Sequence, residues 1–420
     1  MQKITIKNFI NIHDVEMEIK KLTVIIGPQA QGKSIISKLI FYFSDIPKAI
    51  YRSMREGETF DQFHEALKEK FKVIFHEDSY RDKNFAVSYV ENGFAFEIKG
   101  IKKKGAYKLN FNYPYKKVRL AFGEASALLN RPDEQSQEMG IAKTIGPNEF
   151  NLLFTKSIID QLRCTYKACT YIPAGRSFFS NLDGNVFSFL SSGSHLDFFI
   201  REFGGEYRSL RQRFQNDSVR QKGRTITDKS VDEIIEKIIC GKYIIEKGKD
   251  KIVDVNGRKL PLVNTSSGQQ EALPMVHVIR SMLEMKTMTN RFLVIEEPEA
   301  HLFPEAQWNV VKLISKLFNN EQRNSALITT HSPYILTAIN ILIEKGRHRN
   351  IIDLDLQDVN SVDSSEVAAY YLESGVSKDI IDEKCGLIEG HAIDDISDKL
   401  STIFQSLLDS ENSEIVVVKS

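Results

Sequence analysis

The chain has 420 residues, of which 42% are hydrophobic and 27% charged, and its formal net charge is zero. This length and composition are typical of a folded protein with at least one large core, and they exclude a chain that is disordered along most of its length. No run of about 18 consecutive apolar residues occurs, and the start lacks the apolar stretch of a signal peptide, so we expect a cytoplasmic protein without a membrane anchor. The four cysteines match no zinc or disulfide spacing and are expected to be reduced thiols.

The charge is unevenly distributed. Residues 351–420 hold 16 Asp and Glu against 4 Lys, a net charge of −12, which leaves +12 for residues 1–350. The basic body is compatible with nucleic-acid binding. The acidic segment is compatible with docking of a basic partner or with a solvated acidic helical surface.

The N-terminal pattern is strand, glycine loop, helix. Residues 2–9 and 15–20 alternate like strands around a turn, and residues 21–27, KLTVIIG, are an apolar run typical of a buried strand. A helix is predicted from about Lys33 to Phe43.

An antiparallel β subdomain is predicted next. The pattern is helical over residues 60–76 and has period two over residues 85–113, with Gly93, Gly100 and Gly105 as turn points.

The middle of the chain is mainly helical. Helices are expected over residues 117–130 and 148–165, followed by the strand-like CTYIPAGRS at residues 169–177. Residues 185–245 have a helical pattern with polar breaks, which indicates an inserted arm. Residues 241–262 alternate around two glycine turns like a pair of hairpins.

The last patterned segments alternate again. We expect a helix from about Gln269, a strand over RFLVIEE, a helix from Pro304 to Phe318 and a strand over SALITTHS, before the final acidic segment.

The segment GPQAQGKS fits the phosphate-loop pattern G-x-x-x-x-G-K-[ST], and it follows a predicted strand and opens a helix. In such a loop the backbone N–H groups cradle phosphates, Lys33 supplies a charge for the β- and γ-phosphates, and Ser34 can ligate Mg²⁺. The predicted ATP-binding residues here are Gly27, Pro28, Gln29, Ala30, Gln31, Gly32, Lys33 and Ser34.

Acidic residues end the apolar strand in FLVIEEPEAHLFP. One carboxylate there can reach Mg²⁺ and the next can activate a water, which assigns Glu296 to the metal and Glu297 to the role of general base. Taken alone, two Glu after an apolar run are also common at the start of a helix.

Two further segments could complete a nucleotide site. His331, at the end of a second apolar strand, can contact a γ-phosphate or orient water, although a strand-end histidine is often structural. Hydroxyls and free N–H groups at a helix start bind anions, or act simply as a helix cap. The residues concerned are Ser266, Ser267, Gly268 and Gln269.

In this order, the four motifs resemble those of the ABC-type ATPase heads of SMC, RecF and OLD (overcoming lysogenisation defect) proteins, within the AAA group. SSGQQ resembles the ABC signature, IEEPE the Walker B segment, PEAHLFP the D-loop and TTHSP the switch histidine. The opening IKNFIN…KLTVIIGP also resembles RecF-like openings. The resemblance implies an α/β fold, an ABC-type P-loop ATPase head with an antiparallel β subdomain and an inserted helical arm.

The resemblance also implies a mechanism: two copies dimerise head to tail around ATP and Mg²⁺, each signature capping the nucleotide of the other copy. Some positions depart from the family pattern. Ala30 and Gln31 replace Gly-Ser, Glu296 stands where Asp is usual, and no glutamine can be assigned to the Q-loop.

The expected parts are a head in residues 1–184, the arm in 185–245, the second part of the head in 246–350 and the acidic segment in 351–420.

Three basic features carry weaker predictions. Arg176 in YIPAGRS resembles a segment of defence-associated ATPases, and a plain strand-turn salt bridge explains it equally well. Residues 201–225 have seven Arg or Lys against three Asp or Glu, a stripe that can contact nucleic-acid phosphates or the acidic segment. Residues 101–119 interleave lysines with aromatic residues, as a nucleic-acid-binding sheet or a solvated basic strand pair would.

The chain lacks a nuclease signature. Asp353 and Asp355 mimic the acidic pair of the Toprim domain in OLD nucleases, but no suitable Glu-bearing strand precedes them. The chain is therefore similar to ATPase subunits of bacterial anti-phage systems, which act with a separately encoded nuclease or toxin. The alternative is a RecF-like repair ATPase that acts directly on DNA. A transporter subunit is disfavoured by the divergent signature and the RecF-like opening.

Overall fold

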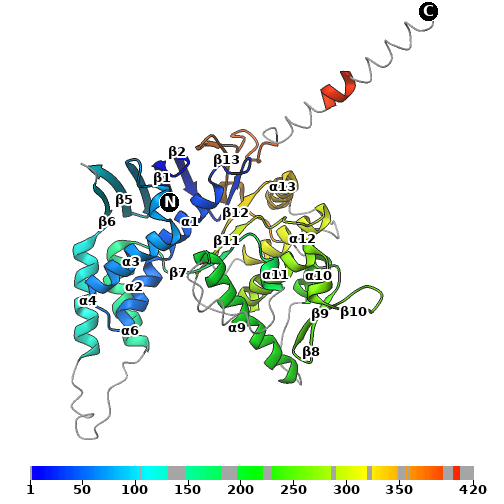
Figure 1. The fold of residues 1–420 in the computed structure, drawn as a ribbon, viewed down its shortest axis with the longest axis horizontal. Coiled ribbons are helices and arrows are strands. Elements are labelled where there is room, and N and C mark those ends of the chain that lie inside the picture. Colours follow the sequence, from blue (N-terminus) through cyan, green and yellow to red (C-terminus); the bar gives the residue numbers. More distant parts are fainter. Residues whose placement is uncertain are drawn as a thin grey trace, which may run out of the picture.

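The computed structural model describes residues 2–103, 106–130, 147–180, 196–220, 229–284, 290–318, 324–348, 356, 359–390 and 401–406. Their largest element is an eleven-stranded sheet with the order β6-β5-β4-β1-β2-β14-β13-β3-β12-β11-β7 (Figure 1). A three-stranded sheet, β10-β9-β8, lies apart from it.

One half of the large sheet is parallel. β3 pairs in parallel with β12 and β13, and β11 pairs in parallel with β12 and β7. Both faces of these strands are covered, so their residues are almost continuously apolar. The strands are β7 (Lys167–Ile172), β3 (Leu22–Ile26), β11 (Asn290–Glu296), β12 (Ser325–Thr330) and β13 (Val367–Glu373).

The other half is an antiparallel wing, as the period-two pattern predicts, but it is continuous with the parallel half and not a separate sheet. The junction is the pairing of β14 with β2. The wing strands are β1 (Gln2–Phe9), β2 (Ile12–Ile19), β4 (Phe85–Glu91), β5 (Phe94–Lys103) and β6 (Ala106–Asn112), and the joining strand is β14 (Val376–Asp379).

Gly100 is not a turn point. It lies inside β5, opposite Leu109 of β6. A Cβ atom at this position would lie 1.8 Å from the Tyr107 hydroxyl and 2.4 Å from the Phe85 ring. The glycine is therefore required by close packing within the sheet.

The C-terminal segment is not only an acidic surface. Its strand β13 inserts between β3 and β14, and Val367, Ala369 and Leu372 are fully buried. The sequence interpretation missed this strand because the acidic residues around it hid a short apolar run.

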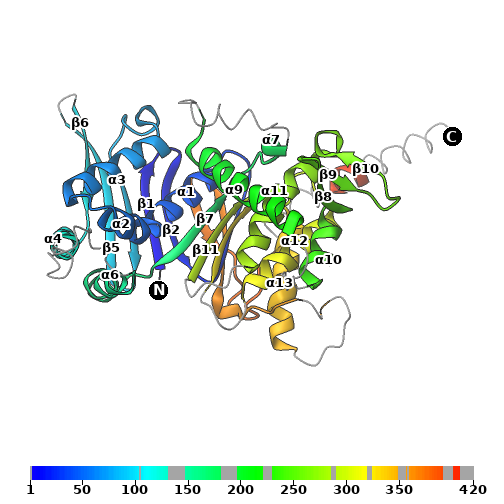
Figure 2. The ribbon, with the colours of Figure 1, turned by 90° about the horizontal axis from the view of Figure 1, so that it is seen from below.

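Helices cover both faces of the sheet (Figure 2). On one face the core includes α1 to α4 and α6, and on the other it includes α7 and α9 to α13. Successive side chains of a strand point to opposite faces of the sheet and so enter different cores. In β3, Ile25 belongs to the first core, and Val24 and Ile26 belong to the second.

The helices of the first face are α1 (Lys33–Ser44), α2 (Ile46–Arg55), α3 (Phe60–Ile74), α4 (Tyr115–Leu129) and α6 (Pro147–Phe154), which continues as a π-helical turn (Thr155–Asp160). Those of the second face are α7 (Ser177–Ser180), α9 (Phe198–Arg220), α10 (Lys229–Ile238), α11 (Ser267–Glu284), α12 (Pro304–Ser315) and α13 (Pro333–Arg347).

The predicted arm contributes to the second core in its described residues. Phe203 and Tyr207 of α9 and Ile234 and Ile238 of α10 are buried there. A projecting arm would leave such side chains in solvent, so these parts of residues 185–245 belong to the body of the head. The small sheet follows as β8 (Lys242–Glu246), β9 (Lys249–Val253) and β10 (Lys259–Pro261), the predicted pair of hairpins.

None of the helices in the described part of the chain combines the length and the apolar character needed to cross a membrane.

Candidate functional site

Three of the predicted motif loops meet at one edge of the sheet. β3, β11, β12 and β7 are parallel, so their carboxyl ends lie at the same edge, where open α/β sheets bind ligands. β3 leads into the phosphate loop, β11 ends at Glu296, and β12 leads to His331. β7 leads into Pro173–Arg176, a segment that sequence reasoning did not place in the site.

The phosphate loop surrounds its own lysine. Lys33 Nζ donates hydrogen bonds to the carbonyls of Gly27 and Pro28, at 2.7 Å each. Burial lowers the pKa of Lys33, and the negative charges of Glu297 and Glu299 act in the opposite direction. The ammonium is thus held at the centre of the loop, where phosphate oxygens can replace the carbonyl contacts.

Neighbouring turns support this loop from behind. A Cβ on Gly27 would lie 2.1 Å from the Leu372 carbonyl oxygen of β13, which requires glycine there. The Asn11 side chain donates to the carbonyl of Ala30 at 2.7 Å, and the Ser374 N–H donates to the Gln31 side chain at 2.6 Å. The C-terminal hairpin is therefore part of the phosphate-loop scaffold.

The exposed rim of the loop consists of backbone and short or polar side chains. Gly32 has φ +102° and ends the loop at the start of α1, so that the helix N-terminus points toward the site. The exposed loop residues are Pro28, Gln29, Ala30 and Ser34.

Glu296 is buried and fully engaged. Its Oε1 accepts a hydrogen bond from the Tyr171 hydroxyl at 2.7 Å, and its Oε2 accepts one from the N–H of Ala174 at 3.2 Å. The Ser37 hydroxyl lies 3.5 Å from the same Oε1 and donates to the carbonyl of Ser34 at 3.0 Å. The Glu296 carboxylate therefore lies beside Ser37, which follows Ser34 by about one turn of α1.

The oxygen atoms of Ser34 and Glu296 are suitable ligands for a magnesium ion. Hydroxyl and carboxylate oxygens are the ligands Mg²⁺ prefers, and the ion usually retains several waters. When bound, Mg²⁺ would neutralise phosphate charge. Ser34 would hold it directly, and Glu296 would act from the position that Tyr171 and Ala174 fix.

Glu297, His331 and Lys33 form a connected group. The two imidazole nitrogens of His331 face different partners: Nε2 lies 3.5 Å from Glu297 Oε1, and Nδ1 lies 3.5 Å from Lys33 Nζ. Both Glu297 and His331 are partly exposed, so water and a bound ligand can reach them. Glu297 has φ +44°, a left-handed conformation that is unfavourable for a non-glycine residue and that its surroundings must enforce.

Glu299 is a site residue that sequence reasoning missed. Its Oε1 accepts from the backbone N–H of His331 at 2.7 Å and from the Thr330 hydroxyl at 2.8 Å. These bonds fix the loop that carries the histidine to the loop that follows β11. The available signal was a third Glu in the same segment, EEPE.

The signature segment begins α11 with a capping box. The Ser266 hydroxyl accepts from the Gln269 N–H at 3.3 Å, and the Gln269 side chain accepts from the Ser266 N–H at 3.1 Å. Ser266 and Ser267 are exposed, and Gln269 also bonds to the carbonyl of Ile239. A Cβ on Gly268 would lie 2.5 Å from the His301 carbonyl oxygen, so this glycine lets α11 pack against the loop after β11.

Arg176 is fully buried and joins three segments. Its guanidinium donates to the carbonyls of Glu296 at 2.7 Å and Glu297 at 2.9 Å, and its Nε donates to the carbonyl of Glu271 in α11 at 3.2 Å. Burial lowers the pKa of Arg176, while the charge of Glu271 raises it. Arg176 does form a salt bridge, but with another element and not within its own turn.

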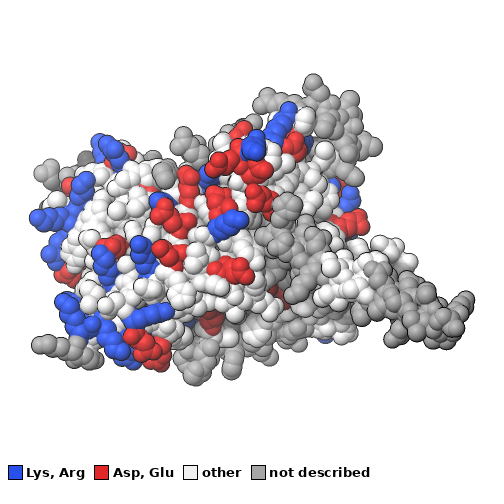
Figure 3. Space-filling model, turned by 90° about the horizontal axis from the view of Figure 1, so that it is seen from above, with Lys and Arg blue, Asp and Glu red and all other residues white. Residues whose placement is uncertain are grey.

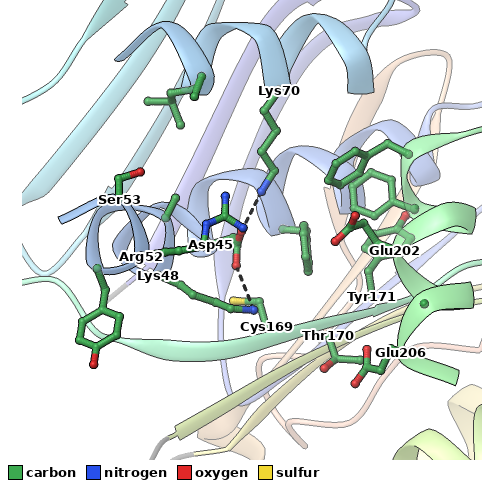
Figure 4. A pocket seen from close by; sticks show the side chains of 18 of the residues that line it. Asp45, Lys48, Arg52, Ser53, Lys70, Cys169, Thr170, Tyr171, Glu202 and Glu206 are labelled. Carbon is green, nitrogen blue, oxygen red and sulfur yellow. Dashed lines mark hydrogen bonds and ion pairs between the residues drawn. The ribbon is translucent and has the colours of Figure 1, made fainter. Parts of the chain in front are cut away.

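A cavity of about 1070 Å³ lies beyond Tyr171, between α2, α3, β7 and α9 (Figure 4). Lys70 and Lys48 approach Asp45 on one side, and Glu202 and Glu206 line the opposite wall. Burial raises the pKa of the Glu206 carboxyl, with Lys48 and a hydrogen bond from Thr170 acting in the opposite direction.

Replacing Glu206 by Gln should raise the melting temperature at pH 8. The raised folded-state pKa means that the ionised carboxylate costs stability above that pKa, at about 1.4 kcal/mol per unit of displacement. The gain should shrink as the pH falls through the folded-state pKa, where the native carboxyl is already neutral. Thermal unfolding of both proteins between pH 4 and pH 8 measures this. Glu233→Gln, at an exposed position on α10, is the control, and a gain that does not depend on pH would contradict the explanation.

The described residues contain no group of three or more His, Cys, Asp and Glu side chains that could hold a metal. Asp353 and Asp355 lie outside the described residues. One residue of the basic stripe at residues 201–225, Arg211, is paired with Asp250 at 2.8 Å.

The fold and this edge have the parts of a P-loop α/β site: parallel strands, a phosphate loop between β3 and α1, and an acidic end on β11. Residues 192–336 match the family model described as an AAA ATPase domain. The match covers the signature segment, β11 and its acidic end, and β12 with His331. This part of the chain is thus similar to AAA ATPase domains.

Similar solved structures cover most of the chain at low identity. The Smc head domain of Pyrococcus furiosus, bound to the C-terminal domain of ScpA, is 12% identical, with 90% of this chain and 96% of that chain covered and a TM-score of 0.39. The SMC head domain of Thermotoga maritima is 13% identical, with 90% and 97% covered and a TM-score of 0.36. The recombination mediator RecF is 15% identical, with 90% and 97% covered and a TM-score of 0.31. No curated protein matches the chain.

Proposed function

We propose that the protein binds ATP with Mg²⁺, dimerises head to tail around two nucleotides and uses hydrolysis to release the dimer. The observation that carries the proposal is a division within the site. Lys33, Glu297 and His331 are in contact within one chain, whereas Ser266 and Ser267 are exposed at the capping box that begins α11. A helix start with exposed hydroxyls can cap a phosphate held by a second copy.

The chemistry follows from the positions of the side chains. The phosphate loop and Lys33 hold the β- and γ-phosphates, and Ser34 with Glu296 would hold the metal that neutralises their charge. Glu297 accepts a proton from the attacking water, and His331 orients that water or the γ-phosphate. The signature of the partner copy completes the site, so hydrolysis depends on dimer formation.

In the cell, we propose that this ATPase is a cytoplasmic, ATP-gated sensor or regulator in an anti-phage system with a separately encoded effector. The support is the resemblance of the motifs to such subunits and the absence of a nuclease signature from the sequence. A pull-down from native cells should recover a stoichiometric second protein. Recovery of the chain alone would contradict the effector part of the proposal.

The second candidate is a RecF-like ATPase that acts directly on DNA. A surface favours it: Lys and Arg gather at the end of the molecule that carries the antiparallel wing (Figure 3). Exposed basic residues of the wing and of α4 include Lys99, Lys102, Lys103, Lys108, Lys116 and Lys117. DNA affinity that falls steeply with salt would favour this candidate.

The first test is the mass of Glu297→Gln protein in solution, measured by light scattering with and without Mg-ATP. Because slow hydrolysis traps the nucleotide sandwich, the mass should double on addition of Mg-ATP and not on addition of Mg-ADP. A mass that stays at the monomer value with saturating ATP would overturn the dimer mechanism. Ser267→Arg in the same background is a matched variant, since a bulky charge in the signature should prevent the increase without altering the phosphate loop.

A further inference from the structure

A buried arginine connects the two halves of the proposed ATP site. Arg176 follows β7 and has none of its surface exposed. Burying a guanidinium is costly unless its donors are satisfied, so its partners indicate what it holds in place. Apart from the carbonyl of Pro173 in its own turn, they lie in two segments that belong to different parts of the site.

The first segment is the end of β11. Arg176 Nη1 donates to the carbonyl of Glu296 at 2.7 Å, and Nη2 donates to the carbonyl of Glu297 at 2.9 Å. These consecutive carbonyls mark the point where the chain turns into the left-handed conformation of Glu297. The planar guanidinium fixes both carbonyls at once, and a lysine ammonium cannot reproduce this geometry.

The second segment is the signature helix. Glu271 lies one turn after Gly268 in α11 and is buried. Its carbonyl accepts from Arg176 Nε at 3.2 Å, and its carboxylate Oε2 accepts from the Arg176 backbone N–H at 2.8 Å and lies 3.5 Å from Nε. A displacement of the start of α11 is therefore passed to Arg176 through three contacts.

We propose that Arg176 is a positioning residue that couples the signature helix, through Glu271, to the backbone of the catalytic glutamate Glu297. This inference rests on the proposed function, in which the signature of one protomer contacts the nucleotide of its partner. Glu297 acts on the nucleotide of its own protomer. Within one chain, Arg176 thus links the signature, which contacts the partner's ATP, to Glu297, which acts on the protomer's own ATP. Binding of the signature to the partner's nucleotide therefore sets the position of the base.

The test compares Arg176→Lys with Arg291→Lys. Arg291 is a second buried arginine that also connects β11 to α11, through the carbonyl of Met282, but at the end of the helix far from the signature. Arg176→Lys should lower kcat about 10- to 100-fold, the loss expected when a reacting group is misplaced by about 1 Å. Its affinity for ATP should remain within about threefold of wild type. Arg291→Lys should change melting temperature and leave kcat unchanged.

Glu271→Gln keeps the inference testable if Arg176→Lys does not fold. Within the described residues, the side chain of Glu271 bonds to Arg176 and not to Glu297 or the phosphate loop. Its replacement should still lower kcat about 3- to 10-fold while ATP affinity is preserved, because coupled side chains share one network. In the double variant with Arg176→Lys, it should cause no further loss. Additive losses, or an unchanged kcat in either single variant, would overturn the coupling.

The outcomes separate this inference from the proposed function. The inference fails alone if wild-type protein hydrolyses ATP and Glu297→Gln protein forms the ATP dimer, but Arg176→Lys retains wild-type kcat. Absence of turnover and of the dimer in those two proteins would overturn the proposed function and the inference together.

Discussion

Glu297→Gln should lower the rate of ATP hydrolysis by about 10² to 10⁴-fold, the usual contribution of a general base. The amide keeps the size and hydrogen-bonding capacity of the side chain but cannot accept the proton of the attacking water. In the structure the carboxylate faces His331 Nε2 at 3.5 Å, and its backbone carbonyl is held by Arg176, so the substitution leaves the scaffold intact. Phosphate release at saturating Mg-ATP measures the loss, and ATP affinity should be unchanged.

The matched control for this variant is Glu344→Gln. Glu344 lies on α13 and pairs with Arg347 and His348, away from the carboxyl edge of the sheet. Its replacement should leave hydrolysis at the wild-type rate. Turnover retained by Glu297→Gln would refute the assignment of the base, and Glu299 and His331 would then be the groups to replace next.

Lys33→Ala should weaken ATP binding by at least about 30-fold, which corresponds to the loss of roughly 2 kcal/mol or more when a charged partner is removed from a desolvated site. Two effects contribute. The positive charge for the phosphates is lost, and the loop loses the two hydrogen bonds from Nζ to its own carbonyls. Equilibrium binding of ATP, measured by calorimetry, tests this, and no dimer should form at ATP concentrations that saturate the wild type.

The control is Lys38→Ala in the same helix. Lys38 pairs with Asp197 at 2.7 Å on a partly exposed surface, so its removal should cost well under about 1 kcal/mol of stability and leave ATP binding intact. If Lys33→Ala binds ATP with wild-type affinity while Lys38→Ala does not, the nucleotide site lies elsewhere on α1.

The secondary structure of the site could be predicted because its signals are local. Each of the motifs GPQAQGKS, IEEPE and TTHSP follows or ends an apolar run and can be recognised within about ten residues. In the structure each run is a strand, and the loop after it leads to the site. The predicted helix from Lys33 and the wing strands also agree with the structure. The strand β13 was missed because a run of six apolar residues flanked by acidic ones is too short to show a clear periodicity.

The sequence by itself determined the motifs, their order and the class of chemistry, because a phosphate loop needs particular residues at fixed spacing. Only the tertiary structure decided which distant residues act with them. Arg176, Glu299 and Tyr171 enter the site through hydrogen bonds to segments that lie up to 125 residues away in the chain. No local pattern encodes such contacts, since they depend on parallel strands that bring four separate loops to one edge of the sheet.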